Sequence, residues 1–126
     1  MPYHSILLID DDVEDHEIFL SAITSISEKL QCIAFTNARE ALGKLVNKDL
    51  NPDVIFLDLN MPIMSGQEFL VEVKKREETQ HIPIIIFSTS SNPSTIKLTK
   101  EMGAIDFITK PNRFDDLIHA LKGVFS

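Results

Sequence analysis

The chain has 126 residues and a formal net charge of −7. This length fits a single domain, residues 1–126, that buries about two thirds of its unfolded surface. The acidic balance disfavours direct binding to nucleic acid or to an anionic membrane, and it suggests a basic partner or bound cations. The single cysteine, Cys32, excludes an internal disulfide and fits a reducing compartment.

Nothing in the sequence indicates export or membrane insertion. The longest apolar runs, "ILLI" and "IIIF", are far shorter than the roughly 18 residues that a membrane span needs. The first residues, "MPYHS", lack the basic and then apolar pattern of a signal peptide. We therefore expect a cytoplasmic protein that does not bind membranes.

Short apolar runs recur along the chain and predict strands. They are "SILLI" (5–9), "CIAFT" (32–36), "VIFL" (54–57), "IPIIIF" (82–87) and "AIDFI" (104–108). These runs are continuously apolar and do not alternate with polar residues, which is typical of parallel strands that are covered on both faces.

Helical spacing of apolar residues lies between and after these runs. The predicted buried faces are Phe19, Ala22, Ile23, Ile26 and Leu30; Ala38, Ala41, Leu42 and Leu45; Gly66, Phe69, Leu70 and Val73; Ile96, Leu98 and Met102; and Phe114, Leu117, Ile118, Leu121 and Phe125. Asn37, Ser65 and Asn92 are predicted N-caps, and Gly103 is predicted to end the helix of 92–103. That helix has the poorest apolar face, so we expect it to be the least firmly held.

Alternating strands and helices predict an α/β fold with a doubly wound, five-stranded parallel sheet. We predict the flavodoxin-like strand order 2-1-3-4-5, in which the first and third strands are neighbours. A crevice opens at the carboxyl ends of the strands where the connections leave in opposite directions. The polar residues that end the apolar runs should therefore meet at one edge of the sheet.

That edge would gather several charged groups. Asp10, Asp11 and Asp12 follow the first strand, Asp58 follows the third, Ser88 follows the fourth and Lys110 follows the fifth. Two carboxylates about 5 Å apart repel by roughly 3 kcal/mol at an effective dielectric constant near 20. A hard divalent cation with oxygen ligands, above all Mg²⁺, suits such a cluster. The competing interpretation, in which the acids of 10–12 only cap the next helix, leaves Asp58 unexplained. We assign capping to Asp12, Glu14 and Asp15.

Four segments carry a resemblance to a known family. "ILLIDDD", "LDLNMPIMSG", "IIIFSTS" and "FITKP", in this order and at these separations, resemble the receiver domain of two-component response regulators. The resemblance covers the whole chain, and the short form is similar to stand-alone receivers of the chemotaxis or phytochrome-partner kind. It implies that Asp58 accepts a phosphoryl group from the phosphohistidine of a sensor histidine kinase or a histidine phosphotransfer protein.

The resemblance also implies roles for the neighbours of Asp58. Asp11, Asp58 and the main-chain carbonyl of Asn60 would bind Mg²⁺ or Mn²⁺, and Asp10 would act through a water molecule. Lys110 would supply a fixed positive charge, and the Ser88 hydroxyl would bond a phosphoryl oxygen. Aspartyl nucleophiles need such a cation and such donors, so the chemistry agrees.

This chain departs from the commonest receiver pattern at three positions. Ser88 replaces the usual Thr, Thr89 replaces Ala and narrows the mouth of the site, and Phe107 replaces Tyr. We expect a two-state switch in which Ser88 moves inward as Phe107 becomes buried. The loop residues Met61, Pro62 and Pro111 would shape the site.

A downstream protein would read the surface formed by residues 92–103, 104–108 and 114–125, and the chain would be a monomer or a phosphorylation-dependent homodimer. We expect a phosphoacceptor that assists its own phosphorylation and dephosphorylation and is not a conventional enzyme.

Two other functions compete with this one. A metal-dependent phosphatase with an aspartyl nucleophile usually has a second acid two residues after the nucleophile, where this chain has Asn60. A flavodoxin-like cofactor binder would cradle a phosphate after the first strand, where the acids of 10–12 would repel it. The four histidines, at 4, 16, 81 and 119, lack the spacing of metal ligands and are predicted to be surface groups.

Overall fold

The computed structural model describes residues 3–90 and 92–125. Strands and helices alternate along these residues: β1 (Ser5–Ile9), α1 (Val13–Ile26), β2 (Gln31–Phe35), α2 (Ala38–Val46), β3 (Val54–Leu57), α3 (Gly66–Lys74), β4 (Ile84–Ser88), α4 (Pro93–Glu101), β5 (Asp106–Thr109) and α5 (Phe114–Phe125). The predicted α/β class is therefore confirmed. Among the described residues, no helix has the length and apolar character that crossing a membrane requires.

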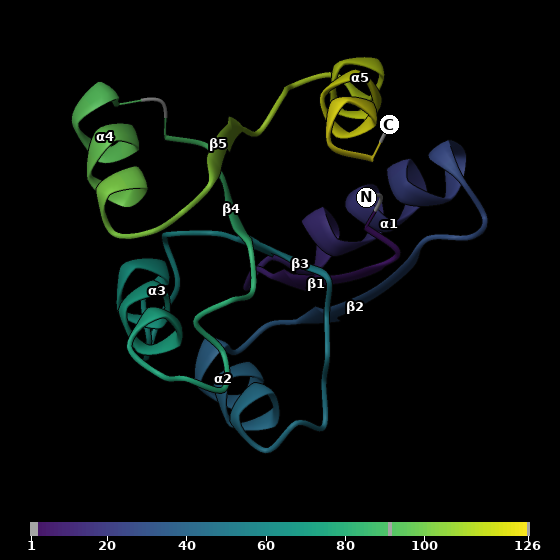
Figure 1. Ribbon diagram of the computed structural model, residues 1–126. Helices are drawn as coiled ribbons and strands as arrows, with labels where there is room; N and C mark the ends of the chain where they lie inside the picture. Colours follow the sequence, from purple (N-terminus) through teal and green to yellow (C-terminus); the bar gives the residue numbers. More distant parts are fainter. Residues whose placement is uncertain (1–2, 91, 126) are drawn as a thin grey trace.

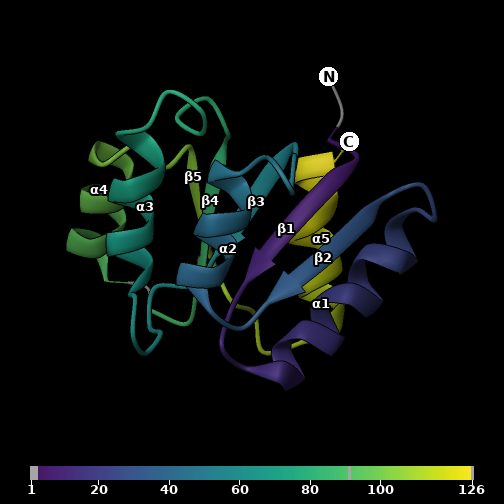
Figure 2. The same cartoon turned by 90° about the horizontal axis from the view of Figure 1, so that it is seen from below.

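The strands form one parallel sheet in the order β2-β1-β3-β4-β5, as predicted. The register pairs Ile9 of β1 with Leu57 of β3, so the residues that follow, Asp10 and Asp58, leave the sheet at the same level. In Figure 2 the arrowheads of β1 and β2 lie at the same end of the sheet. The order and the register together bring the carboxyl ends of separate strands to one edge.

Helices cover both faces of the sheet (Figure 1). On one face α2 and α3 pack with the sheet in an aliphatic cluster that includes Leu7, Leu57 and Leu70. On the other face α1 and α5 pack around Phe19, Phe56 and Phe87, whose rings meet edge to face with centroids 5.1–6.2 Å apart. Strands covered on both faces need apolar residues on both faces, which is why the predicted runs were continuous.

The predicted caps explain where three helices begin. The Asn37 side chain accepts a hydrogen bond from the amide of Glu40 at the start of α2, and Asn92 accepts one from Ser94 at the start of α4. Ser65 and Glu68 form a reciprocal capping box at the start of α3. Each cap satisfies amide groups that the first helical turn leaves without a partner.

The helix faces differ in places from those expected, and in α5 the predicted Phe114 is 43% exposed. The helix α1 ends at Ile26, so Leu30 lies beyond it. Leu30 immediately precedes β2 and packs against the cluster that contains Phe19, Phe56 and Phe87. In α4, the predicted face of Ile96, Leu98 and Met102 contributes no fully buried residue, and Leu98 is 50% exposed. The buried residue of α4 is Thr99, whose hydroxyl donates to the carbonyl of Ile96 and so leaves no unpaired polar group. The expectation of a weakly held α4 therefore agrees with its packing.

Candidate functional site at the carboxyl edge of the sheet

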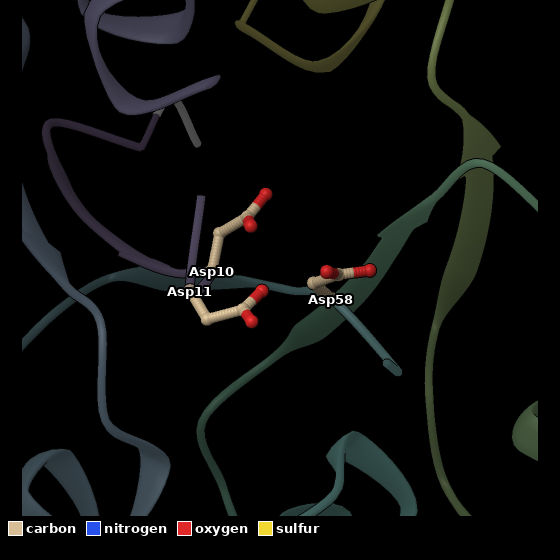
Figure 3. Close-up of side chains that lie close together, drawn as sticks. All are labelled: Asp10, Asp11 and Asp58. Atoms are coloured by element: carbon tan, nitrogen blue, oxygen red, sulfur yellow. The ribbon is translucent and has the colours of Figure 1, made fainter. Parts of the chain in front are cut away.

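Three carboxylates meet at the edge where β1 and β3 end. Asp10 and Asp11 follow β1 and Asp58 follows β3, and each offers an oxygen within 4.8 Å of the others. Figure 3 shows these side chains, with those of Asp10 and Asp11 extending from one segment beside that of Asp58. Asp10 is 0% and Asp58 7% exposed, whereas Asp11 is exposed. The predicted convergence of acids is present.

Main-chain hydrogen bonds hold Asp58 in place at the end of β3. Its amide donates to the carbonyl of Ile9 at 2.9 Å, and its Oδ1 accepts from the amide of Leu59 at 2.9 Å. Burial raises the pKa of the Asp58 carboxyl above its ordinary value; Lys110 opposes this rise and the Asp10 carboxylate adds to it. The second oxygen, Oδ2, lies 3.8 Å from Lys110 Nζ, which is beyond hydrogen-bonding distance.

Lys110 lies among the acids. Its Nζ is 2.6 Å from Asp10 Oδ2, 2.8 Å from Asp15 Oδ2 and 3.8 Å from Asp58 Oδ2. Its amide donates to the carbonyl of Ser88, which fixes the backbone of the lysine to the end of β4. Burial alone would lower the pKa of the ammonium, but the hydrogen bonds to Asp10 and Asp15 outweigh it and the pKa is raised. The lysine therefore stays charged at neutral pH.

The loop after Asp58 passes so close to α3 that only a glycine fits there. A Cβ on Gly66 would lie 2.3 Å from the carbonyl oxygen of Asp58 and 2.6 Å from the Cα of Leu59. In the same loop Ile63 adopts a φ of 69°, a region that β-branched residues rarely enter, and it is 70% exposed. Met61 packs against the aliphatic cluster, and Pro62 is exposed with its carbonyl bonded to the Met64 amide. The loop is thus a tight, strained turn that delivers Asp58 to the edge.

The fourth and fifth strands contribute the remaining predicted residues. Ser88 is the last residue of β4 and fully buried, and its hydroxyl oxygen accepts from the amide of Ser90 at 3.4 Å. Thr89, next in the chain, is exposed. Phe107, in β5, is half-buried against the aliphatic cluster. Pro111 follows Lys110 and lines a cavity of about 270 Å³ between α1 and α5.

The donor set suits a hard divalent cation. Oxygen atoms of Asp10, Asp11 and Asp58 lie close enough to share one ion, and carboxylates are the ligands that Mg²⁺ prefers. Within residues 3–90 and 92–125, the Asp11 carboxylate has no hydrogen-bond donor or ion-pair partner, so its oxygens are free to bind. Asp10 differs, because Oδ1 accepts from the Asp12 amide and Oδ2 from Lys110. The residues therefore fit a metal that contacts Asp11 and Asp58 directly.

Comparison with known proteins identifies the family. The sequence matches the response regulator receiver domain family over residues 6–122. The chain belongs to this family. It is thus a receiver domain of two-component signalling, and its sheet order is the one that solved receivers share.

Individual relatives agree with this assignment. Two-component response regulator ORR3 of Oryza sativa subsp. indica is 30% identical over 116 residues, which are 92% of this chain and 86% of that protein. The phosphorylated cyanobacterial phytochrome response regulator RcpA has a crystal structure that superposes with a TM-score of 0.86 at 28% identity, over 96% of this chain and 91% of that one.

Other relatives carry the receiver as part of a longer protein. A protein-glutamate methylesterase/protein-glutamine glutaminase of Syntrophomonas wolfei is 34% identical over 115 residues, which are 89% of this receiver but only 31% of that protein. This receiver domain therefore spans about a third of the length of that relative.

The structure places two further residues of this receiver at the site. Asp12, Glu14 and Asp15 were predicted to cap α1: Asp12 is the N-cap and the other two lie in the first turn, but Asp15 also pairs with Lys110, which was not predicted. His16 was predicted to lie on the surface, and this was wrong: it is 8% exposed, and its Nε2 contacts the carbonyl oxygen of Asp10. Both residues lie near the start of α1, which follows the end of β1 in the chain. Their position at the start of the helix could have indicated that they lie near the end of β1, but nothing in the sequence indicated which residue each would contact.

Proposed function

We propose that this receiver accepts a phosphoryl group on Asp58 and passes the resulting signal through its surface to a protein partner. The observation that carries the proposal is the surroundings of Asp58 Oδ2. This oxygen is 3.8 Å from the Lys110 ammonium, and the Asp58 carboxylate lies within 4.8 Å of carboxylate oxygens of Asp10 and Asp11 that could share a cation with it. A nucleophilic carboxylate needs this combination, because incoming phosphoryl oxygens must be neutralised as they approach.

Mg²⁺ or Mn²⁺ is the proposed cofactor. Asp11, Asp58 and the main-chain carbonyl of Asn60 would hold it directly, while Asp10 would act through a water because both of its carboxylate oxygens already accept hydrogen bonds. When bound, the ion supplies positive charge to the phosphoryl oxygens. The repulsion among three nearby carboxylates gives the site its affinity for a cation.

The protein's own residues would carry the transfer. The Asp58 oxygen attacks phosphorus, the bond between phosphorus and the donor's leaving atom breaks, and the leaving group departs with the electron pair. Lys110 stabilises the charge on the phosphoryl oxygens, and the Ser88 hydroxyl donates to one of them. Later hydrolysis by water returns Asp58 to a carboxylate. The chain would act as a phosphoacceptor and not as a conventional enzyme.

The proposed donor is a sensor histidine kinase or a histidine phosphotransfer protein. RcpA, which is 28% identical, was crystallised in a phosphorylated form, and this supports the capacity of the fold for the modification. We further propose a cytoplasmic location, a single receiver domain over residues 1–126, and an output surface formed by α4, β5 and α5. In the same proposal the chain works as a monomer or as a homodimer that forms on phosphorylation.

The phosphatase alternative is less well supported by the site. A second carboxylate two residues after the nucleophile would act as general acid, and Asn60 occupies that position. Asp10 and Asp15, the acids nearest to Lys110, are both engaged by its ammonium. Of the three clustered acids in the described part of the chain, Asp11 is a proposed metal ligand, Asp10 is paired with Lys110 and Asp58 is the proposed nucleophile, so none of them is left to protonate the leaving group of an ester.

Incubation with acetyl phosphate and Mg²⁺, followed by intact mass, tests this function. We expect one phosphoryl group per chain, removed by hydroxylamine as an acyl phosphate, and none when Mg²⁺ is chelated. The variant Asp58→Asn should fold normally and gain no phosphoryl group. Equal labelling of Asp58→Asn and wild type would sink the assignment of Asp58.

A further inference from the structure

Asp15 is the residue of the site for which the proposed chemistry has no role. It lies in the first turn of α1, and its Oδ2 is 2.8 Å from Lys110 Nζ. The pair is largely withdrawn from solvent, since the side chains of Lys110 and Asp15 are 11% and 32% exposed. An ion pair with this geometry restricts a lysine that would otherwise sample many rotamers.

Asp10 and Asp15 hold the ammonium from different sides. Asp10 is fully buried below the end of β1 and bonds Lys110 Nζ at 2.6 Å. Asp15 and Lys110 both line the cavity of about 270 Å³ between α1 and α5, and Asp10 and Asp58 do not. Asp15 therefore reaches the lysine from the cavity, away from the metal-binding acids.

The two carboxylates do not use all the hydrogen-bond donors of the Lys110 ammonium. A lysine ammonium has three N–H donors. Two of them are used by Asp10 and Asp15, and Oδ2 of Asp58 lies at 3.8 Å, beyond hydrogen-bonding distance. One donor is therefore left over on the side of Asp58. A phosphoryl group on Asp58 would bring oxygens towards it.

We propose that Asp15 is a positioning residue for phosphoryl transfer: it fixes Lys110 so that the remaining N–H points at the group that Asp58 receives. This inference rests on the proposed function of Asp58 and adds a residue to it. A donor that is already oriented needs no rearrangement when charge develops, and this lowers the barrier to transfer. Without Asp15 the ammonium would keep the Asp10 bond but rotate about it.

The negative charge of Asp15 and its contact with Lys110 should affect the rate of phosphoryl transfer in opposite directions, which makes the inference testable. Removing a negative charge near the site should by itself ease the approach of an anionic phosphodonor. Removing the anchor of Lys110 should slow the transfer. Glu14 separates the two effects: it is the neighbouring acid in the same helical turn, it is exposed, and its carboxylate has no hydrogen bond or ion pair with a described residue.

The experiment compares the initial rate of labelling by acetyl phosphate, at saturating Mg²⁺, in wild type, Asp15→Asn, Asp15→Glu and Glu14→Gln. We expect Asp15→Asn to be labelled about tenfold more slowly, the effect of losing one orienting charged hydrogen bond in the transition state. Glu14→Gln should be labelled at the wild-type rate or faster. Asp15→Glu keeps the charge on a longer side chain and should recover part of the lost rate.

A thermal melt separates positioning from folding. Asp15→Asn and Glu14→Gln each remove one acid from the first turn of α1, and Asp15→Asn also removes an ion pair, so its melting temperature should fall further than that of Glu14→Gln while both variants stay folded at the assay temperature. Labelling of Asp15→Asn at the wild-type rate, or slowing shared equally by Glu14→Gln, would overturn the positioning role while leaving Asp58 as acceptor. A wild-type chain that takes up no phosphoryl group would contradict the proposed function and this inference together.

Discussion

Asp53 secures the edge of the sheet opposite the proposed phosphorylation site. Its Oδ2 accepts hydrogen bonds from the amides of His4 and Ser5, both at 2.9 Å, so it ties the beginning of β1 to the beginning of β3. The amide of Ser5, and then that of His4, lower the pKa of the Asp53 carboxyl. A carboxyl with a lowered pKa in the folded state stabilises the fold when it is ionised.

We predict that Asp53→Ala lowers the free energy of unfolding by about 1 kcal/mol at pH 7. The contribution of Asp53 is fully present above the unfolded carboxyl pKa of about 3.9 and is lost as pH falls through the lower folded value. The difference between variant and wild type should therefore shrink as urea unfolding is repeated from about pH 5 down to pH 2.5. Asp49→Ala, an exposed acid nearby, is the control. A difference that grew at low pH would refute the assignment.

At the scale of elements, the contact between α3 and the loop after Asp58 is the tightest in the site. Gly66 begins α3, and a methyl group there would collide with the main chain of Asp58 and Leu59. Main-chain atoms cannot turn aside as a flexible side chain can. The loop would have to shift, and Asp58 would shift with it.

We predict that Gly66→Ala lowers the free energy of unfolding by about 2 kcal/mol or more and slows labelling by acetyl phosphate. Gly43, in the middle of α2, is the matched control because an added Cβ there meets nothing within 4 Å. Gly43→Ala should raise stability by about 0.5–1 kcal/mol through helix propensity, with labelling unchanged. Urea titration of both variants measures this. Equal stability of the two alanine variants would contradict the close contact at Gly66.

The helix α4 is the element best suited to move. Thr99 is its single buried residue, and its leading segment starts from Ser88 at the end of β4. Phe107 in the adjacent β5 is half-buried, so it has room to become more buried. Elements with few buried contacts open at low free energy.

We predict that a beryllofluoride mimic of the phosphoryl group shifts the NMR signals of α4 methyl groups and of the Phe107 ring. The reason is a coupled two-state change, with Ser88 drawn towards the mimic and Phe107 filling the vacated space. In Ser88→Ala the loop of Asp58 should still respond, while α4 and Phe107 should not. Unmoved α4 and Phe107 signals in the wild type, with a clear response at Asp58, would exclude the switch.

For the whole molecule, charge governs stability as well as binding. The chain carries a net charge of −7, and part of it is concentrated where Asp10, Asp11 and Asp58 meet. A cation that binds only the folded state stabilises it by mass action, by about 1.4 kcal/mol for each tenfold excess over the dissociation constant. Lys110 offsets part of the repulsion before any cation binds.

We predict that Mg²⁺ raises the melting temperature of wild type and has no such effect on Asp11→Ala. Without Mg²⁺, Asp11→Ala should be at least as stable as wild type, because it removes repulsion with its two neighbours. Asp49→Ala, which removes one charge elsewhere, should respond to Mg²⁺ like wild type. If Mg²⁺ stabilised Asp11→Ala as much as wild type, the metal site would lie elsewhere.

Much of the molecule could be predicted because its signals are local. Continuous apolar runs marked the five strands, and the polar residues after the first, third, fourth and fifth runs marked one edge of the sheet, so the meeting of Asp58 with Asp10 and Lys110 followed from strand order. Three features had no local signal. The Asp15–Lys110 pair spans 95 positions in sequence, Ile63 takes a positive φ that no propensity anticipates, and His16 is buried where its Nε2 contacts the carbonyl oxygen of Asp10.

The central claim is that Asp58 carries the phosphoryl group. The direct test is to label the wild-type chain with acetyl phosphate and Mg²⁺, reduce it with borohydride, and map the modified residue by peptide mass spectrometry. Borohydride converts an aspartyl phosphate to homoserine, which marks the position permanently. We predict homoserine at residue 58 alone. Homoserine at Asp10 or Asp11, or a stable phosphate on a serine or threonine, would contradict this account.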